Sequence, residues 1–315
     1  MRARRPSTFR IEGPAGQEIT SLDDWLRYAP PKKGERHWRP GRSAMESARA
    51  WLDDGHGPTV PAEIAEVLNS HELTRAFRPE LAVPELVTRL DDFRGEHRNH
   101  DLVVVGEAAG GRTLLAIEAK ADESFGDHTV DAYLQLCAKR EKEYPAKVDA
   151  ARRAGKGRPR SSNAAARIEQ LCAALFGPAL ESERVAQVAK PLRYQLVTAF
   201  AGALIEARAR SCTQAVLLVH EFLSEPNAAR AIPGTRSSLV ERNAAAFADF
   251  ARAVTADPSA DVRKGHLLGP LAVPGNARVP DLPLLLGKAR RNVSWPDSGL
   301  VQNWDKVPPP RPRSE

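Results

Sequence analysis

The sequence has little of what marks zinc-binding, secreted or membrane-spanning proteins. It contains three cysteines in 315 residues, Cys137, Cys172 and Cys212, and they are far apart. No cysteine or histidine pair has the spacing of a zinc site, and isolated thiols are typical of a reducing compartment. No run of about 18 apolar residues is present, and no apolar segment follows the basic N-terminus. We therefore expect a cytoplasmic protein without a membrane span.

The motifs of several enzyme classes are also missing. There is no P-loop, no dinucleotide-binding glycine motif after a strand, no nucleophile elbow and no HExxH pair. Aromatic residues are scarce, at 6%, while the apolar and charged fractions of 42% and 27% are ordinary for a globular chain. The net charge of +6 favours a phosphate-rich partner such as nucleic acid, although several arginines lie near the two ends. These are Arg2, Arg4, Arg5, Arg10, Arg311 and Arg313.

Two apolar runs joined by a glycine-rich turn are the most informative part of the chain. Asp101 begins the first run, and the second ends in Glu118, Ala119 and Lys120. If the hairpin closes symmetrically about residues 109–110, Asp101 lies directly opposite Glu118, with Cβ atoms about 4.5 to 5.5 Å apart. Two like charges at that distance require a cation between them, and Mg²⁺ suits a pair of carboxylates. Lys120 projects from the same face as Glu118, where it could hold an attacking water.

This arrangement resembles the PD-(D/E)xK nuclease superfamily. Its signature is an acidic residue at the start of one core strand and (D/E)-x-K on the next, within an αβββαβ core. Asp101, Glu118 and Lys120 match the signature, while His100 stands where the family usually has proline. The resemblance covers residues 43–222 and implies an α/β fold with a mixed central sheet.

The same resemblance implies an Mg²⁺-dependent endonuclease-type phosphodiesterase acting on nucleic acid, chiefly DNA, with Mn²⁺ able to substitute. Asp101, Glu118 and the main-chain carbonyl of Ala119 would hold the metal. Lys120 would orient the water or stabilise the charge that develops on the phosphate. A surface hairpin with a charge-paired face is the alternative. The continuous apolar run 114–117 argues against it, because such runs are typical of strands buried on both sides.

Three further residues are candidates for the same site. Glu46 lies on a helix predicted over 43–52, and in the family this helix often supplies another acidic ligand. The spacing Ser43-x-x-Glu46 is equally that of a capping box, in which Glu46 turns back to the helix backbone. Gln195, on a helix predicted over 191–210, is placed like the polar residue that supports the lysine in several family members, with Arg193 as its alternative. Glu123 could contribute from farther away.

The chain divides into four parts on composition. They are an N-terminal extension with a basic loop (1–42), the core (43–222) with a helical insertion at 121–189, a C-terminal α/β extension (223–302) and a proline-rich tail (303–315) expected to be disordered. Residues 1–20 are expected to be loosely structured. Helices are predicted over 22–28, 43–52, 61–69, 129–154, 163–189, 191–210 and 237–254; strands over 81–90, 102–106, 113–119, 213–222, 265–274 and 279–287.

Two segments could contact a binding partner. The basic loop at 30–40 contains Trp38, which could stack on a base or dock on the body of the protein. The helical insertion carries a basic tip at 155–162, and it could form a homodimer surface or an arm over the substrate; its charge favours the arm. A catalytically silent nuclease fold that binds nucleic acid or a protein partner is the alternative to an enzyme.

Overall fold

The computed structural model describes residues 9–32, 34–93, 95, 97–159, 161–177, 182–224 and 238–294. Their centre is a seven-stranded mixed sheet with the strand order β1-β2-β3-β4-β5-β7-β6. β2, β3 and β4 are antiparallel, and β4, β5 and β7 are parallel. The strands are β1 (Arg10–Ile11), β2 (Arg78–Thr88), β3 (Arg98–Ala108), β4 (Gly111–Lys120), β5 (Gln214–Leu223), β6 (Leu267–Leu271) and β7 (Leu284–Asn292). The predicted mixed α/β class is confirmed.

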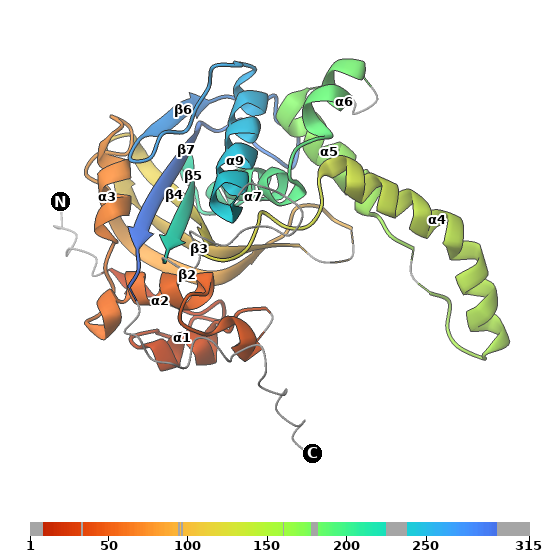
Figure 1. The fold of residues 1–315 in the computed structure, drawn as a ribbon, viewed down its shortest axis with the longest axis horizontal. Helices are drawn as coiled ribbons and strands as arrows, with labels where there is room; N and C mark the ends of the chain where they lie inside the picture. The colour runs from red at the N-terminus through yellow and green to blue at the C-terminus, as the bar shows by residue number, and fades with distance from the viewer. Residues whose placement is uncertain are drawn as a thin grey trace, which may run out of the picture.

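Helices cover both faces of the sheet (Figure 1). α1, α2 and α3 pack with one face, and α5, α7 and α9 pack with the other. The helices are α1 (Leu22–Tyr28), α2 (Ser43–Trp51), α3 (Ala62–Asn69), α4 (Val130–Arg153), α5 (Ala164–Phe176), α6 (Glu183–Ala189), α7 (Tyr194–Ala209) and α9 (Leu239–Thr255). Within the described residues, no helix is both long and apolar enough to cross a membrane.

Strand β3 shows why the sheet is buried on both sides. Val103 and Val105 join the core under α7, while Leu102 and Val104 join the core under α2 and α3. Because side chains alternate along a strand, a continuous apolar run feeds both cores at once. Helix α7 lies against this sheet with nearly every side chain from Leu196 to Ile205 buried. The central strands and α7 therefore form the rigid frame on which the site is built.

The N-terminal segment is more ordered than its sequence suggests. Ile11 and Ile19 are completely buried, and β1 pairs with β2 in parallel. The prediction of a loosely structured segment is wrong for residues 10–19, because a two-residue strand is too short to show periodicity. The loop at 30–40 contains a short 3₁₀ helix, Gly34–His37, and Trp38 packs against the core, as the docking alternative predicted.

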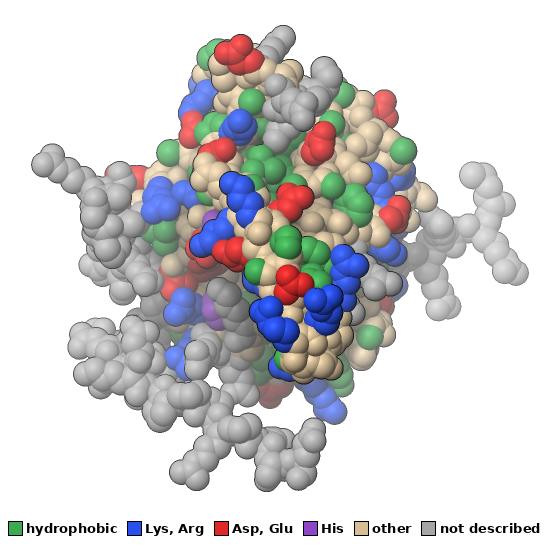
Figure 2. Space-filling model, turned by 90° about the vertical axis from the view of Figure 1, so that its right-hand side faces the viewer, with side chains coloured by type: hydrophobic (Ala, Val, Ile, Leu, Met, Phe, Trp, Pro, Cys, Tyr) green, Lys and Arg blue, Asp and Glu red, His purple; other side chains and the backbone are tan. Residues whose placement is uncertain are grey.

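The C-terminal extension and the insertion complete the molecule. β6 and β7 are antiparallel neighbours, but β6 ends at Leu271 and β7 begins at Leu284, so their connection is longer than the predicted strands over 265–274 and 279–287 imply. Of the insertion, α4 projects away from the body (Figure 1), and only Val130 and Cys137 of this helix are buried. Lysines and arginines gather on its exposed sides (Figure 2). These are Lys139, Arg140, Lys142, Lys147, Arg152 and Arg153. The proline-rich tail lies outside the described residues.

Candidate active site

The hairpin of β3 and β4 has the register that the sequence predicts. Its pairs run from Ala108 opposite Gly111 to Leu102 opposite Ile117, so the turn is at residues 109–110. Beyond Leu102, β3 pairs with β2 and β4 pairs with β5, and the two strands diverge. Asp101 lies at the fork, where its Oδ2 accepts a hydrogen bond of 2.8 Å from the Ala119 N–H. The Asp101 carboxylate thus replaces the next main-chain hydrogen bond between β3 and β4.

Glu118 is the most enclosed carboxylate of this fork. It is completely buried, and three donors reach its two oxygens. Lys120 Nζ and Gln195 Nε2 donate to Oε1 at 2.7 and 2.6 Å, and the Arg98 guanidinium pairs with Oε2. Burial raises the pKa of Glu118, but the charges of Arg98 and Lys120 outweigh it and hold the pKa at about 2. Glu118 is therefore ionised and fully bonded.

The neighbouring groups respond to burial differently. Burial and the charge of Glu118 raise the pKa of Asp101 well above its usual range, and Lys120 and Arg98 only partly oppose this. Burial lowers the pKa of Lys120, but Glu118, Glu123 and Asp101 together raise it above its ordinary value. Lys120 therefore carries its positive charge, whereas the ionised form of Asp101 is disfavoured.

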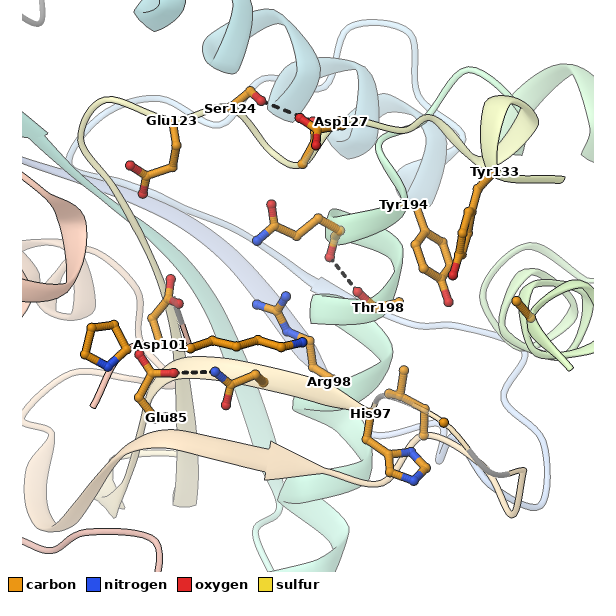
Figure 3. A pocket seen from close by; sticks show the side chains of 18 of the residues that line it. Glu85, His97, Arg98, Asp101, Glu123, Ser124, Asp127, Tyr133, Tyr194 and Thr198 are labelled. Atoms are coloured by element: carbon orange, nitrogen blue, oxygen red, sulfur yellow. Dashed lines mark hydrogen bonds between the residues drawn. The ribbon is translucent and has the colours of Figure 1, made fainter. Parts of the chain in front are cut away.

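The fork forms part of a cavity of about 920 Å³, whose lining includes Asp101, Lys120, Arg98 and Gln195. Figure 3 shows Glu85 beside Asp101 at one end, with Glu123 across the cavity. Burial raises the pKa of Glu85 to about 7, although Asn99 donates a hydrogen bond to it. Burial likewise raises the pKa of Glu123, whose carboxyl interacts with Lys120 and accepts a bond from Ser43.

Of the predicted site residues, the structure brings together Asp101, Glu118, Lys120 and Gln195. Arg193 is not among the cavity residues, and it precedes the first turn of α7. Ala119 lies between Glu118 and Lys120, and its N–H is bonded to Asp101. A ligand role for its carbonyl stays a prediction.

Glu46 is not brought to this group. Ser43, Ala44 and Ser47 of α2 line the cavity, whereas Glu46 is buried next to them and accepts a bond of 3.2 Å from the Gly41 N–H. Its carboxyl therefore turns back to the chain just before the helix. The predicted capping box does not form either, because the N-cap is Arg42 and not Ser43.

Arg98 and Glu85 are the site residues that the sequence did not indicate. Arg98 begins β3 four residues before the predicted strand, and nothing distinguishes it from the other polar residues there. Glu85 has a φ of +51°, a conformation uncommon for residues other than glycine, next to Pro84. Proline within the strand did signal an irregularity, but not the direction of the next side chain.

The carboxylates at the fork suit a hard divalent cation. Within the described residues, no three Asp, Glu, His or Cys side chains are grouped as a ready metal centre. Mg²⁺ needs fewer protein ligands, because it keeps several waters and binds through one or two carboxylates. Burial and the charge of Glu118 disfavour the ionised form of Asp101, and a bound cation would favour it. Glu118 could join as a ligand only by giving up one of its present partners.

Comparison with known proteins gives one match. The model of a family described as a domain of unknown function (DUF6946) matches residues 18–293, which include the whole fork and the cavity. No curated protein and no solved structure matches the chain.

Proposed function

The chain belongs to the DUF6946 family, a domain of unknown function, and we propose that it is a metal-dependent nuclease that hydrolyses phosphodiester bonds in DNA. The observation that carries the proposal is the meeting of Asp101, Glu118 and Lys120 beside a large cavity, where β3 and β4 diverge. The order of the elements supports it, since α2, the three strands β2 to β4, α7 and β5 follow one another as in an αβββαβ core. On this reading the core is restriction-endonuclease-like.

In this proposal Asp101 and Glu118, with the Ala119 carbonyl, would hold Mg²⁺. The metal supplies two effects when bound: it lowers the pKa of a coordinated water and neutralises charge on the scissile phosphate. Lys120 acts as a cation and not as a base, because its pKa is raised. Its ammonium is fixed at 2.7 Å from Glu118, which aims it at the water or at the charge developing on the phosphate. Gln195 keeps the Glu118 carboxylate in place from α7.

One observation favours a second candidate, a nuclease-like scaffold that binds without cutting. Glu118 already has a complete set of partners in Arg98, Lys120 and Gln195. An ion pair this well compensated can persist simply as part of the core. The two candidates differ in whether Mg²⁺ or Mn²⁺ can displace Arg98 from Glu118, and cleavage depends on that displacement.

The proposal also includes a cellular compartment and a role for α4. The three buried free cysteines suit a cytoplasmic protein. The basic arm of α4 would follow the phosphate backbone outside the cavity, and a homodimer through the insertion is its alternative. Binding of DNA that weakens steeply between 50 and about 200 mM salt supports the arm. A dimer that persists in that salt range supports the second alternative.

The test is cleavage of plasmid and single-stranded DNA with Mg²⁺ or Mn²⁺ by the wild type, Asp101→Asn and Lys120→Met. We expect each substitution to lower the rate by about 10²- to 10³-fold, the usual cost of losing one electrostatic group at the reacting centre. Lys288→Met is the matched control. Lys288 is as buried as Lys120 and pairs with Glu221 at 2.8 Å, but it does not line the cavity. Its variant should cut normally.

The outcomes separate the candidates. Activity that disappears in Asp101→Asn and Lys120→Met but stays in Lys288→Met supports the enzyme and its site together. Equal activity in all four proteins indicates a contaminant and contradicts the proposal. Binding of DNA without cleavage by any of them supports the scaffold.

A further inference from the structure

The end of the cavity away from the carboxylates is built from aromatic rings. Tyr133 of α4 and Tyr194 of α7 lie with their ring centroids 4.8 Å apart. Tyr133 also stacks on His128, at 5.8 Å and an interplanar angle of 8°. Figure 3 shows the two tyrosines side by side, with Tyr194 on the side of Thr198 and the fork. We call Tyr133 and Tyr194 the tyrosine end of the cavity. The chain has only four tyrosines, so this pairing is a concentration of a scarce residue.

A buried ion pair holds the tyrosine end in place. Arg167 of α5 binds Asp91 through Nε and through Nη2, the latter at 3.1 Å from Oδ1. The same guanidinium donates to the Tyr194 hydroxyl, whose pKa is raised by burial. Arg167 borders the cavity, but it and Asp91 are almost fully buried, so Tyr194 is held by an ion pair with little exposure to solvent. The rings are therefore preformed, which reduces the entropy lost when a flat ligand binds.

The cavity lining also contains a buried polar atom without a partner. His97 lines the cavity on the other side of Thr198 from the tyrosines (Figure 3), and its Nδ1 is buried without a hydrogen-bond partner in the part of the chain that the structure describes. Burial and the charge of Arg167 lower the pKa of His97, which favours the neutral imidazole. A neutral imidazole can donate or accept a hydrogen bond. The cavity therefore offers a polar group as well as two aromatic rings to a ligand.

The walls of the cavity limit what can reach the tyrosine end. Residues of the N-terminal loop, Pro31, Lys32 and His37, contribute to the lining together with Arg140 and Asn163 of the insertion. A volume of about 920 Å³ is at the upper end of the range for small-ligand pockets, about 300 to 1,000 Å³. It can hold a nucleotide or two. A duplex would not bring a base to the rings, because its bases are stacked on one another.

We propose that the tyrosine end binds the base of an unpaired nucleotide next to the scissile phosphate. The substrate is then a single strand, or a strand displaced from a duplex, and not intact duplex DNA. Base stacking on aromatic side chains contributes about 1 to 3 kcal/mol per base and tolerates any sequence. The position of cleavage depends on the proposed nuclease function, because it places the neighbouring phosphate at the Asp101–Lys120 end. The binding of an unpaired base at the tyrosine end does not depend on that function.

The experiment measures binding in the absence of cleavage. Lys120→Met protein, in chelator, is titrated into oligodeoxynucleotides that carry 2-aminopurine, either single-stranded or annealed to a complement. We expect the single strand to bind at least tenfold more tightly and its 2-aminopurine fluorescence to be quenched by stacking. A matched single-stranded RNA tests whether the 2′-hydroxyl matters.

Substitutions locate the effect. In the same background, Tyr194→Leu should weaken single-strand binding by about 5- to 150-fold and abolish the quenching. Tyr194→Phe keeps the ring and should bind within twofold. Tyr144→Leu is the matched control, because Tyr144 lies farther along α4 and bonds to the Pro159 carbonyl outside the cavity. Tyr133→Leu provides a second test should Tyr194→Leu not fold.

The results distinguish the two proposals. Duplex bound as tightly as single strand, or quenching that survives both leucine substitutions in folded protein, overturns the tyrosine end as a base site. If the fluorescence is quenched and the single strand is preferred, but the protein never cleaves DNA, the base site is supported and the nuclease function is contradicted. If intact duplex and single strand are cleaved at equal rates, the nuclease function is supported and the preference for an unpaired base is contradicted.

Discussion

Two ion-paired carboxylates of this protein, one buried and one partly exposed, have similar partners and different surroundings. Glu118 pairs with Arg98 and Lys120 at the fork of β3 and β4. Glu63 of α3 binds Arg291 of β7 at 2.7 Å and His220 of β5 at 2.8 Å. In both, the partners overcome burial and lower the pKa to about 2. A low pKa therefore does not distinguish an active site from a structural ion pair.

The difference is in the next shell of charges. Around Glu118, the carboxyls of Asp101, Glu85 and Glu123 all have raised pKa values and line a cavity. Glu118 is among the charges that raise the pKa of Asp101 and of Glu85. The side chains that shift the pKa of Glu63 are those of His220 and Arg291, and neither lines the cavity. Titratable groups whose pKa values are pushed apart are the mark of sites that do chemistry. The Glu63 group joins α3 to two strands, whereas the Glu118 group lies among carboxyls whose ionised forms are disfavoured.

The largest effect should come from Arg98→Gln. Removing one partner of a buried ion pair costs about 3 to 5 kcal/mol, because the other charge stays buried. The same change opens Oε2 of Glu118 to a metal. Mn²⁺ should therefore raise the melting temperature of Arg98→Gln by more than it raises that of the wild type, since a ligand stabilises the state it binds. Thermal unfolding with and without Mn²⁺ measures this.

Arg291→Gln is the control for that experiment. It breaks the equivalent pair with Glu63 and should also lose stability. Mn²⁺ should not recover it beyond the wild-type shift, because the side chains that shift the pKa of Glu63 are those of His220 and Arg291 and not those of other carboxyls. Equal recovery of both variants, or of neither, would show that metal binding does not distinguish the two clusters.

The next effect belongs to Glu63→Gln. A pKa lowered from 4.5 to about 2 corresponds to at most about 3 kcal/mol of stability at neutral pH, and solvent screening of these partly exposed groups reduces this to about 1 to 2 kcal/mol. The contribution is fully present above pH 4.5 and is lost as the pH falls towards 2, since the carboxylate is then protonated in both states. Urea unfolding should show the variant less stable at pH 7 and the gap smaller at pH 4. A pH-independent gap would mean that packing, and not charge, is the cause.

The Glu63→Gln variant also tests the contrast between the Glu63 and Glu118 ion pairs through its cleavage activity. Glu63 does not line the cavity, so the cleavage rate per folded molecule of Glu63→Gln should equal that of the wild type. A loss of rate comparable to that of Asp101→Asn would place both clusters in one functional unit and end the distinction between them.

The parts of the site that could be predicted from sequence are those fixed by local periodicity. The alternation along the hairpin and its turn at residues 109–110 predict the observed register, which runs as far as Leu102 opposite Ile117 and so brings Asp101 close to the end of β4. Gln195 came from the resemblance to the nuclease superfamily, with Arg193 as its alternative. Arg98 and Glu85 could not be found this way, because each depends on how β2 pairs with β3 beyond the hairpin. Non-local pairing of that kind leaves no periodic signal in the sequence.

Glu46 shows that a helix can be predicted correctly while the direction of one of its side chains is not. The prediction of a helix over 43–52 agrees with α2, and Ser43, Ala44 and Ser47 of this helix do line the cavity. Successive residues of a helix are about 100° apart, so an error of one position turns a side chain away from the site. The rotation of α2 is set by its buried residues, Ala48 and Trp51, which pack into the core.

The smallest effect should therefore come from Glu46→Gln. Burial raises the pKa of Glu46 to about 7, so its favourable contribution is present below pH 4.5 and is lost as the pH rises through 7. The variant should be more stable than the wild type at pH 8 by about 1 kcal/mol, because removing the charge is partly offset by burying an amide that lacks a partner for its N–H groups. At pH 4 the advantage should disappear. Cleavage should stay within twofold of the wild type at both pH values, and a tenfold loss in folded protein would return Glu46 to the metal site.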